Sequence, residues 1–314
     1  IISTAALYVM KPILIPLVFS VFTYIVINPF IDWCEDKLRL PKFFAIFIAL
    51  ILLILIFMGL ITIMGVSIKA FIAGISGYRW KVLNTLDHLS NMASSYGLNV
   101  DLSLIRQSLL ELPVLHMIKS VSGSVFGLVG NSILILICTM FLLVGKSNKE
   151  AKGITNRLLN QQISKYLLIK LLTSTITGLL VSIILILFNI QFAVMFGVIT
   201  FLLNFIPSIG SIIAILLPMP IIFIQLGYGL ESMLCIIIII VIHFIIGNII
   251  DPKLMGESQG LHPAIILASL LFWGFIWGLP GMFLAVPMTA IIKRVLNLYE
   301  TTKPISSILE GQFK

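Results

Sequence analysis

Polar and helix-breaking residues occur in this sequence where almost everything around them is apolar. The run from 171 to 230 contains no Asp, Glu, Lys or Arg, yet it includes the sequence LNFIPSIG. A proline removes one backbone donor and disrupts the turn before it, and a glycine permits conformations closed to other residues. The freed backbone groups must face protein or water. This chemistry indicates a polar-solute site or a protein-packed bend at Asn204, Pro207, Ser208 and Gly210.

The amide of Asn204 has two interpretations. It either satisfies a backbone group that the break leaves free or binds a polar solute. Asn often forms hydrogen bonds between membrane helices, whereas polar residues inside a membrane are functional by default. The residues alone leave both interpretations open.

A second group of candidate residues follows the apolar run at 232–250. The sequence GNIIDPKLMGESQGLH contributes Asn248, Asp251, Pro252 and Gly256. We interpret this segment as a cytoplasmic loop that forms a gate or an ion site. The alternative is that Asp251 is a surface acid paired with Lys253 in that loop.

Three ionisable groups are candidates for ion coupling: Asp251, Glu231 and His243. His243 lies in the middle of an apolar run, where a charged imidazole would be costly. A neutral, hydrogen-bonded histidine is therefore favoured over a proton relay at this position.

The sequence lacks the motifs that predict an enzyme. It contains no HExxH, no GxSxG and no Walker loop. Its cysteines, Cys34, Cys138 and Cys235, are not paired by spacing, and no cluster has metal-ligand spacing. We predict a protein that is not an enzyme, with no catalytic residue, no metal site and no cofactor.

The elements that must position these residues are membrane helices. The chain has 314 residues, of which 60% are hydrophobic and only 10% charged, and its mean hydropathy is +1.17. Several uncharged runs exceed the roughly 20 residues that cross a bilayer as a helix. Because the runs are continuous, they predict an all-α multi-span helical bundle. The net charge of +8 is assigned to membrane topology, so no nucleic-acid partner is expected.

The distribution of Lys and Arg predicts the orientation of the chain. Basic residues cluster at 32–42 and 146–170 and are sparser at 69–119, so the first two segments are assigned to the cytoplasm. With a cytoplasmic N-terminus, this topology requires one more span before Ile1. The predicted divisions are N-terminal transmembrane helices at 1–66, extracytoplasmic amphipathic helices at 67–120, a span plus a basic cytoplasmic interfacial helix at 121–165, a transport core at 166–300 and a cytoplasmic tail at 301–314.

The core is predicted to contain two similar units. Each has a continuous helix followed by a broken apolar segment, at 192–225 and at 263–297. The second break has the sequence WGLPG, with Pro280 and Gly281. The predicted topology makes the repeat inverted, a plan typical of alternating-access transport with a solute site where the breaks meet. The broken segments are either re-entrant hairpins or paired short spans.

Four sequence blocks occur in one order: KYLLIKLLTSTITGLL, FLLNFIPSIGSIIAILLP, GNIIDPKLMGESQGLHP and LLFWGFIWGLPGMFLAVPMTAIIK. Together with INPFID at 27–32, they resemble the bacterial autoinducer-2 exporter family of membrane transporters. The resemblance implies a multi-pass transporter of the bacterial inner membrane that forms homo-oligomers, with pentamers among them. It implies autoinducer-2 as one cargo and sodium or lithium/proton antiport in other members. The motif positions carried over are Asn204, Pro207, Gly210, Asn248, Asp251, Pro252 and Gly256.

The function predicted first is a secondary transporter that exports a small polar solute. The second hypothesis is a Na⁺(Li⁺)/H⁺ antiporter that relies on Asp251, with Glu231 or His243. Against it stands the apparent lack of charge in the apolar interior, because proton coupling normally needs buried ionisable groups. The third hypothesis is an oligomeric channel or a membrane scaffold.

Overall fold

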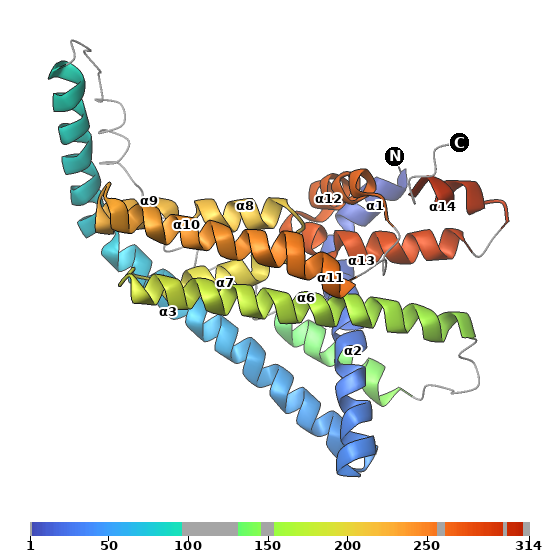
Figure 1. Cartoon of the computed structure of the whole chain (residues 1–314). Coiled ribbons are helices and arrows are strands. Elements are labelled where there is room, and N and C mark those ends of the chain that lie inside the picture. Colours follow the sequence, from blue (N-terminus) through green and yellow to red (C-terminus); the bar gives the residue numbers. More distant parts are fainter. Residues whose placement is uncertain (1, 96–130, 146–153, 256–260, 298–299, 310–314) are drawn as a thin grey trace.

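The computed structural model describes residues 2–95, 131–145, 154–255, 261–297 and 300–309. Every regular element in these ranges is a helix (Figure 1). The helices are α1 (Ile2–Val9), α2 (Lys11–Leu38), α3 (Lys42–Ser95), α6 (Ile154–Leu187), α7 (Ala193–Leu203), α8 (Ile209–Leu216), α9 (Met219–Leu226), α10 (Leu230–Ile245), η2 (Ile246–Ile250), α11 (Asp251–Met255), α12 (Pro263–Trp277), α13 (Leu279–Leu296) and α14 (Lys303–Leu309). A further apolar helix covers Asn131–Val144.

Six helical segments are long and apolar enough to cross a membrane. They are Lys11–Leu38, Lys42–Val66, Ile163–Leu187, Ile209–Leu226, Leu230–Leu254 and Leu279–Leu296. Their length and composition follow from the uncharged runs of the sequence. The prediction of an all-α, multi-span membrane protein is confirmed.

The helices continue further than the hydrophobic runs predicted. α2 extends to Leu38, so most of the basic segment 32–42 is helical, and the turn falls at Arg39 in the left-handed region. α3 is one helix of 54 residues, about 80 Å long at 1.5 Å per residue. α6 begins at Ile154, so residues 154–165 of the segment expected as a basic interfacial helix are continuous with the following span. The rest of that segment, residues 146–153, and residues 121–130 of the span predicted before it lie outside the described residues. The remainder of the predicted outer segment, residues 96–120, lies outside the described residues.

The break in the first unit lies between α7 and α8 and contains an unusual turn. Ser208 has φ 61° and ψ −58°, and the N–H of Ile209 donates a hydrogen bond of 2.7 Å to the carbonyl of Pro207. This is the geometry of the classic γ-turn, which is strained for a residue with a side chain. The chain therefore reverses at Ser208 within a few residues of the end of α7.

The second break, between α12 and α13, also contains a residue with positive φ. Gly278 lies between the two helices, as the C-cap of α12 and the N-cap of α13, with φ 68° and ψ −145°. Without a Cβ, glycine adopts this conformation at little cost. α12 then packs along α13, which makes residues 263–296 a helical hairpin.

Each break is closed by a glycine that packs on the carbonyl of the preceding helix. A Cβ added to Gly210 would lie 1.8 Å from the carbonyl oxygen of Leu203, and one added to Gly281 would lie 2.0 Å from that of Trp273. No side chain fits at either distance. The two units thus share a tight glycine contact in the first turn after the break. Their inverted orientation and their placement as re-entrant segments stay predictions.

The two breaks meet in the core. The ring of Phe205 stacks on that of Phe283 of α13, with centroids 4.2 Å apart. Ile206 belongs to the same buried cluster as Trp273, Trp277 and Leu284. The cluster also includes residues of α2 and α6, so the first break is held against the second hairpin by apolar packing.

We predict that Gly281→Ala destabilises the protein, because the new methyl group collides with the backbone of α12. The expected loss is roughly 1–3 kcal/mol, the usual range for overpacking. The measurement is the thermal unfolding midpoint of purified protein in detergent. The control is Gly59→Ala in α3, where nothing lies within 4 Å of the added Cβ. Equal midpoints for the two variants would contradict the close approach.

Candidate functional site

A stripe of polar side chains runs along the buried face of α6. Its members recur at spacings of three and four, the spacing of one helical face, and all are at most 5% exposed: Tyr166, Lys170, Thr173, Ser174 and Thr177. The exposed face carries Thr175, whose hydroxyl donates to the carbonyl of Leu171. The polar atoms on the buried face need partners from neighbouring elements. The stripe is therefore the frame on which the candidate site is built.

The ammonium group of Lys170 pairs with the carboxylate of Asp251. Its Nζ donates a hydrogen bond of 2.5 Å to Oδ2, and the two residues are only 5% and 7% exposed. The proposed surface pairing of Asp251 with Lys253 is therefore wrong. Lys253 is exposed, whereas Asp251 is turned into the bundle. A lysine and an aspartate buried in a membrane protein mark a functional site by default.

A π-helical turn directs Asp251 towards α6. The N–H of Asp251 donates to the carbonyl of Ile246, five residues earlier. Ile239, His243 and Ile246 form the buried face of this helix, and a regular α-helix would place residue 250 next on that face. The wider turn contains one more residue, so Asp251 takes that place. π-turns are often found at functional sites.

The segment expected as a loop after residue 248 is therefore helical up to Met255. Pro252 follows the π-turn directly and has no N–H to donate to the preceding turn. A proline at this point is compatible with the start of α11.

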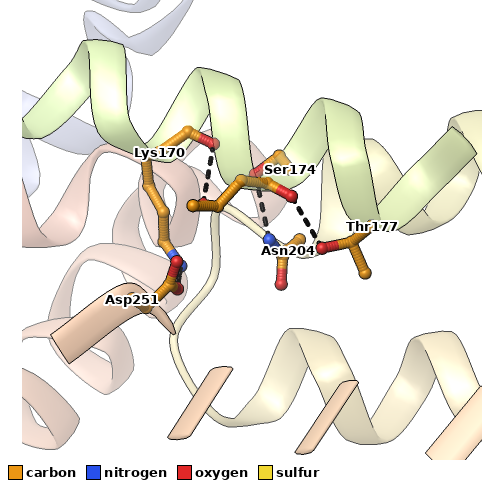
Figure 2. A network of polar contacts seen from close by, with 6 residues as sticks. Lys170, Ser174, Thr177, Asn204 and Asp251 are labelled. Atoms are coloured by element: carbon orange, nitrogen blue, oxygen red, sulfur yellow. Dashed lines mark hydrogen bonds and ion pairs between the residues drawn. The ribbon is translucent and has the colours of Figure 1, made fainter. Parts of the chain in front are cut away.

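Asn204 connects the first break to the polar stripe. It follows the last residue of α7, is 3% exposed, and its Nδ2 donates a hydrogen bond of 3.1 Å to the Oγ of Ser174. Figure 2 shows Asn204 and Asp251 on the same side of α6, with Asn204 between Lys170 and Thr177. The structure brings these two predicted residues together through α6.

Small residues let α6 and α7 pack closely beside this stripe. A Cβ on Gly197 would lie 1.7 Å from the Oγ of Ser182, and a Cβ on Gly178 would lie 2.6 Å from the carbonyl of Gly197. Small residues at membrane-helix contacts allow this close backbone approach. The contact fixes α7, and so Asn204 at its end, against the polar face of α6.

The remaining predicted residues lie away from the buried stripe. Ser208, Asn248 and Pro252 are exposed, Pro207 and Pro280 are half-buried, and Gly210 and Gly281 are buried in helix contacts. Gly256 lies outside the described residues. Glu231 is exposed in the first turn of α10, at the opposite end of that helix from Asp251.

His243 is buried, and its Nδ1 lies 2.9 Å from the carbonyl of Ile239. Within the part of the chain that the structure describes, no three His, Cys, Asp or Glu residues are grouped so that they could hold a metal ion. The site therefore consists of one ion pair and neutral polar groups.

Sequence reasoning missed Lys170, Ser174 and Thr177. Lys170 was counted only as part of a basic segment that sets topology. The signal was present, because these three residues follow helical spacing within KLLTSTITGLL, at the edge of the uncharged run. Periodicity among polar residues within an apolar helix predicts a buried polar face.

Comparison with known proteins decides the family. Residues 1–301 match the family described as AI-2E family transporter. The chain belongs to this family. A protein of Haemophilus influenzae with a provisional name as a transport protein is 30% identical, over 98% of this chain and 93% of its own length. The AI-2 transport protein TqsA of Escherichia coli is 25% identical, over 91% of this chain and 86% of its own length.

The AI-2E family assignment fixes the general role and location of the protein. It is a multi-pass protein of the bacterial inner membrane with a role in membrane transport. The resemblance seen in the sequence is confirmed by this match. The residues of the buried stripe therefore lie inside a transporter.

We predict that the Lys170–Asp251 pair behaves as a coupled unit. Lys170→Met leaves a buried carboxylate without its partner, which should lower the unfolding free energy by about 3–5 kcal/mol. The double variant Lys170→Met/Asp251→Leu should regain most of that loss, because no buried charge is left alone. Thermal unfolding of the four proteins in detergent gives the coupling energy. Additive single effects would contradict the pair.

A second prediction tests the π-turn. Exchanging residues 250 and 251 (Ile250→Asp with Asp251→Ile) keeps the length and composition but moves the carboxylate off the face of α6. Lys170 then has no partner, so adding Lys170→Met should raise the thermal midpoint. The same Lys170→Met change should lower the midpoint of the unaltered protein. The same sign in both backgrounds would contradict the role given to the π-turn.

Proposed function

We propose that this protein is a secondary transporter that exports a small polar solute by alternating access. The observation that supports the proposal most directly is the second oxygen of Asp251. Oδ1 is buried and has no hydrogen-bond partner among the described residues. A buried acceptor without a donor is rare in proteins, and a transported solute with hydroxyl groups would supply one.

The charge of the site favours a neutral cargo. Lys170 and Asp251 cancel each other, and the neighbouring side chains Ser174 and Asn204 are neutral. An anionic or cationic solute would have to separate the ion pair, whereas a neutral hydroxylated solute would not. The relative TqsA carries autoinducer-2 in its name. We propose a small, hydroxyl-bearing signal of this kind as the cargo.

The contacts of the stripe also fit alternating access. Asn204 is bonded to α6 four residues before the strained turn at Ser208, and Asp251 is bonded to α6 at the end of a π-turn. Both partners thus sit beside backbone irregularities, where helices bend most readily. A solute bonded to Oδ1 leaves the Lys170–Asp251 pair joined. Exchange of the Asn204–Ser174 hydrogen bond for a bond to the solute would release the first break from α6.

One observation favours a second function, a Na⁺(Li⁺)/H⁺ antiporter. The interior is not free of charge, contrary to the argument made from the sequence, because Lys170 and Asp251 are both buried. A cation that binds Asp251 would displace the ammonium of Lys170. Glu231 takes no part in this alternative, since it lies at the other end of α10.

An oligomeric channel or scaffold remains the third hypothesis, and a homo-oligomer, with pentamers as one form, stays a prediction. Native mass spectrometry of the purified protein measures the subunit number. A channel gives linear, unsaturable flux, and a scaffold gives none.

We predict saturable counterflow of a neutral hydroxylated solute in proteoliposomes, tested across sugars, polyols, autoinducer-2 and Na⁺ or Li⁺. Asn204→Leu should reduce the rate about tenfold, the effect of losing one buried hydrogen bond of about 1.4 kcal/mol. Thr175→Val on the exposed face of the same helix is the control and should leave the rate unchanged. Sodium-dependent proton flux that is lost in Asp251→Asn, without solute counterflow, would instead support the antiporter.

A further inference from the structure

His243 is a buried polar group to which the solute site described above gives no role. It is 4% exposed and lies in the last turn of the apolar helix α10. Its Nδ1 lies 2.9 Å from the carbonyl oxygen of Ile239. A carbonyl only accepts, so Nδ1 carries the ring proton and Nε2 of the neutral ring is an acceptor. The sequence favoured a hydrogen-bonded histidine here, and its neutral state stays a prediction.

The acceptor Nε2 has no partner in the described part of the chain. It is fully buried, like Oδ1 of Asp251, and the structure gives neither atom a donor within the residues described. A buried acceptor of this kind is destabilising unless something donates to it. A bound molecule with hydrogen-bond donors would satisfy both atoms.

The two acceptors lie on one face of the same helix. The π-turn holds one residue more than an α-helical turn. This extra residue places Asp251 on the same buried face as Ile239, His243 and Ile246. Eight residues separate His243 from Asp251, or about 12 Å of helix rise. Both side chains are thus turned to the interior of the bundle rather than to its surface.

The opposite wall of this interior is α6. α6 and α10 pack against each other and run in opposite directions (Figure 1). Asp251 pairs with Lys170, so His243 lies near the level of Thr177, seven residues or about 10 Å further along α6. The hydroxyl of Thr177 donates to the carbonyl of Thr173, which leaves its oxygen able to accept.

We propose that the polar path between α6 and α10 continues from Asp251 to His243, where Nε2 accepts a hydrogen bond from the transported solute. This proposal rests on the transport function proposed above. The path then has an unpartnered acceptor at each end, Oδ1 of Asp251 and Nε2 of His243. His243 is a residue that contacts cargo rather than a group that only stabilises the helix.

The chemistry of this path defines the solute class. The path offers Oδ1 of Asp251, Nε2 of His243 and the oxygen of Thr177 as acceptors, so the solute must present several O–H or N–H donors. Helices α6 to α9 contain no Asp or Glu, so at His243 nothing on these elements attracts a cation. A neutral polyhydroxylated molecule meets both conditions, whereas a metal cation meets neither of them at His243.

Accessibility of a cysteine at position 243 tests whether a path reaches this depth. Cys34, Cys138 and Cys235 are replaced by Ala, and His243→Cys and Thr177→Cys are introduced separately. The probe is the neutral 2-hydroxyethyl methanethiosulfonate, which carries a hydroxyl group as the proposed solute does and reacts in water. We expect both cysteines to react at least tenfold faster than a cysteine at Val181, which is fully buried in an apolar cluster with Ile239. Reaction at the rate of Val181→Cys at both positions overturns the path.

The contact with cargo has its own test. His243→Gln keeps an acceptor, and His243→Leu removes it at similar size. With a neutral pentitol as the probe, we expect His243→Leu to raise the KM of counterflow about tenfold and His243→Gln to restore at least half of the effect. Equal KM values for both variants and the unaltered protein overturn the contact.

The two tests separate this inference from the transport function. Counterflow in the unaltered protein with unreactive cysteines at both positions defeats the inference alone. Reactive cysteines in a protein that carries no neutral solute support the path and defeat the proposed transport function.

Discussion

The buried pair of Lys170 and Asp251 constrains the rest of the site. Neither charge is stable alone in a low-dielectric interior, so each requires the other within hydrogen-bond distance. Their separation of 2.5 Å therefore fixes the end of α10 and α11 against α6. It also fixes which face of α6 is buried, and Ser174 lies one turn further along that face. The hydrogen bond from Asn204 to Ser174 then positions the first break. The ion pair thus fixes how α6, the end of α10 with α11, and the first break pack against one another.

Departures from regular helix occur where the polar groups require them. The π-turn before Asp251 and the γ-turn at Ser208 both interrupt apolar sequence. The π-turn directs Asp251 to α6, whereas a regular α-helix would turn it elsewhere. The γ-turn reverses the chain four residues after Asn204. Backbone groups inside a membrane tolerate irregular geometry only where protein or water covers them. The packing of Gly210 and Gly281 on carbonyls of the preceding helices supplies that cover at both breaks. Local strain and global packing therefore depend on each other.

The sequence predicted the fold class and both breaks but only half of the site. Long uncharged runs determine membrane helices by composition alone, and Pro207 and Gly278 mark the breaks through local backbone chemistry. The partner of Asp251 depends on how helices far apart in sequence pack, which a single sequence does not reveal. Lys170 was therefore interpreted only as part of the basic segment 146–170 that sets the topology. Helix ends were also misjudged at Leu38 and Met255, because polar residues continue a helix when tertiary contacts support it.

The arrangement of charge along α6 and α10 also separates the transport hypotheses. The ion pair lies one turn from the Tyr166 end of the polar stripe, and the other members of the stripe are neutral. A cation could exchange with Lys170 at Asp251, but beyond that point it would meet only neutral oxygens and an imidazole nitrogen. Leaving its water there would be unfavourable without a compensating charge. A neutral hydroxylated solute exchanges one hydrogen bond for another along the whole stripe, and it needs no charge to move with it. A cation can therefore bind at the buried pair, but the polar groups within the next three turns of helix suit a neutral cargo.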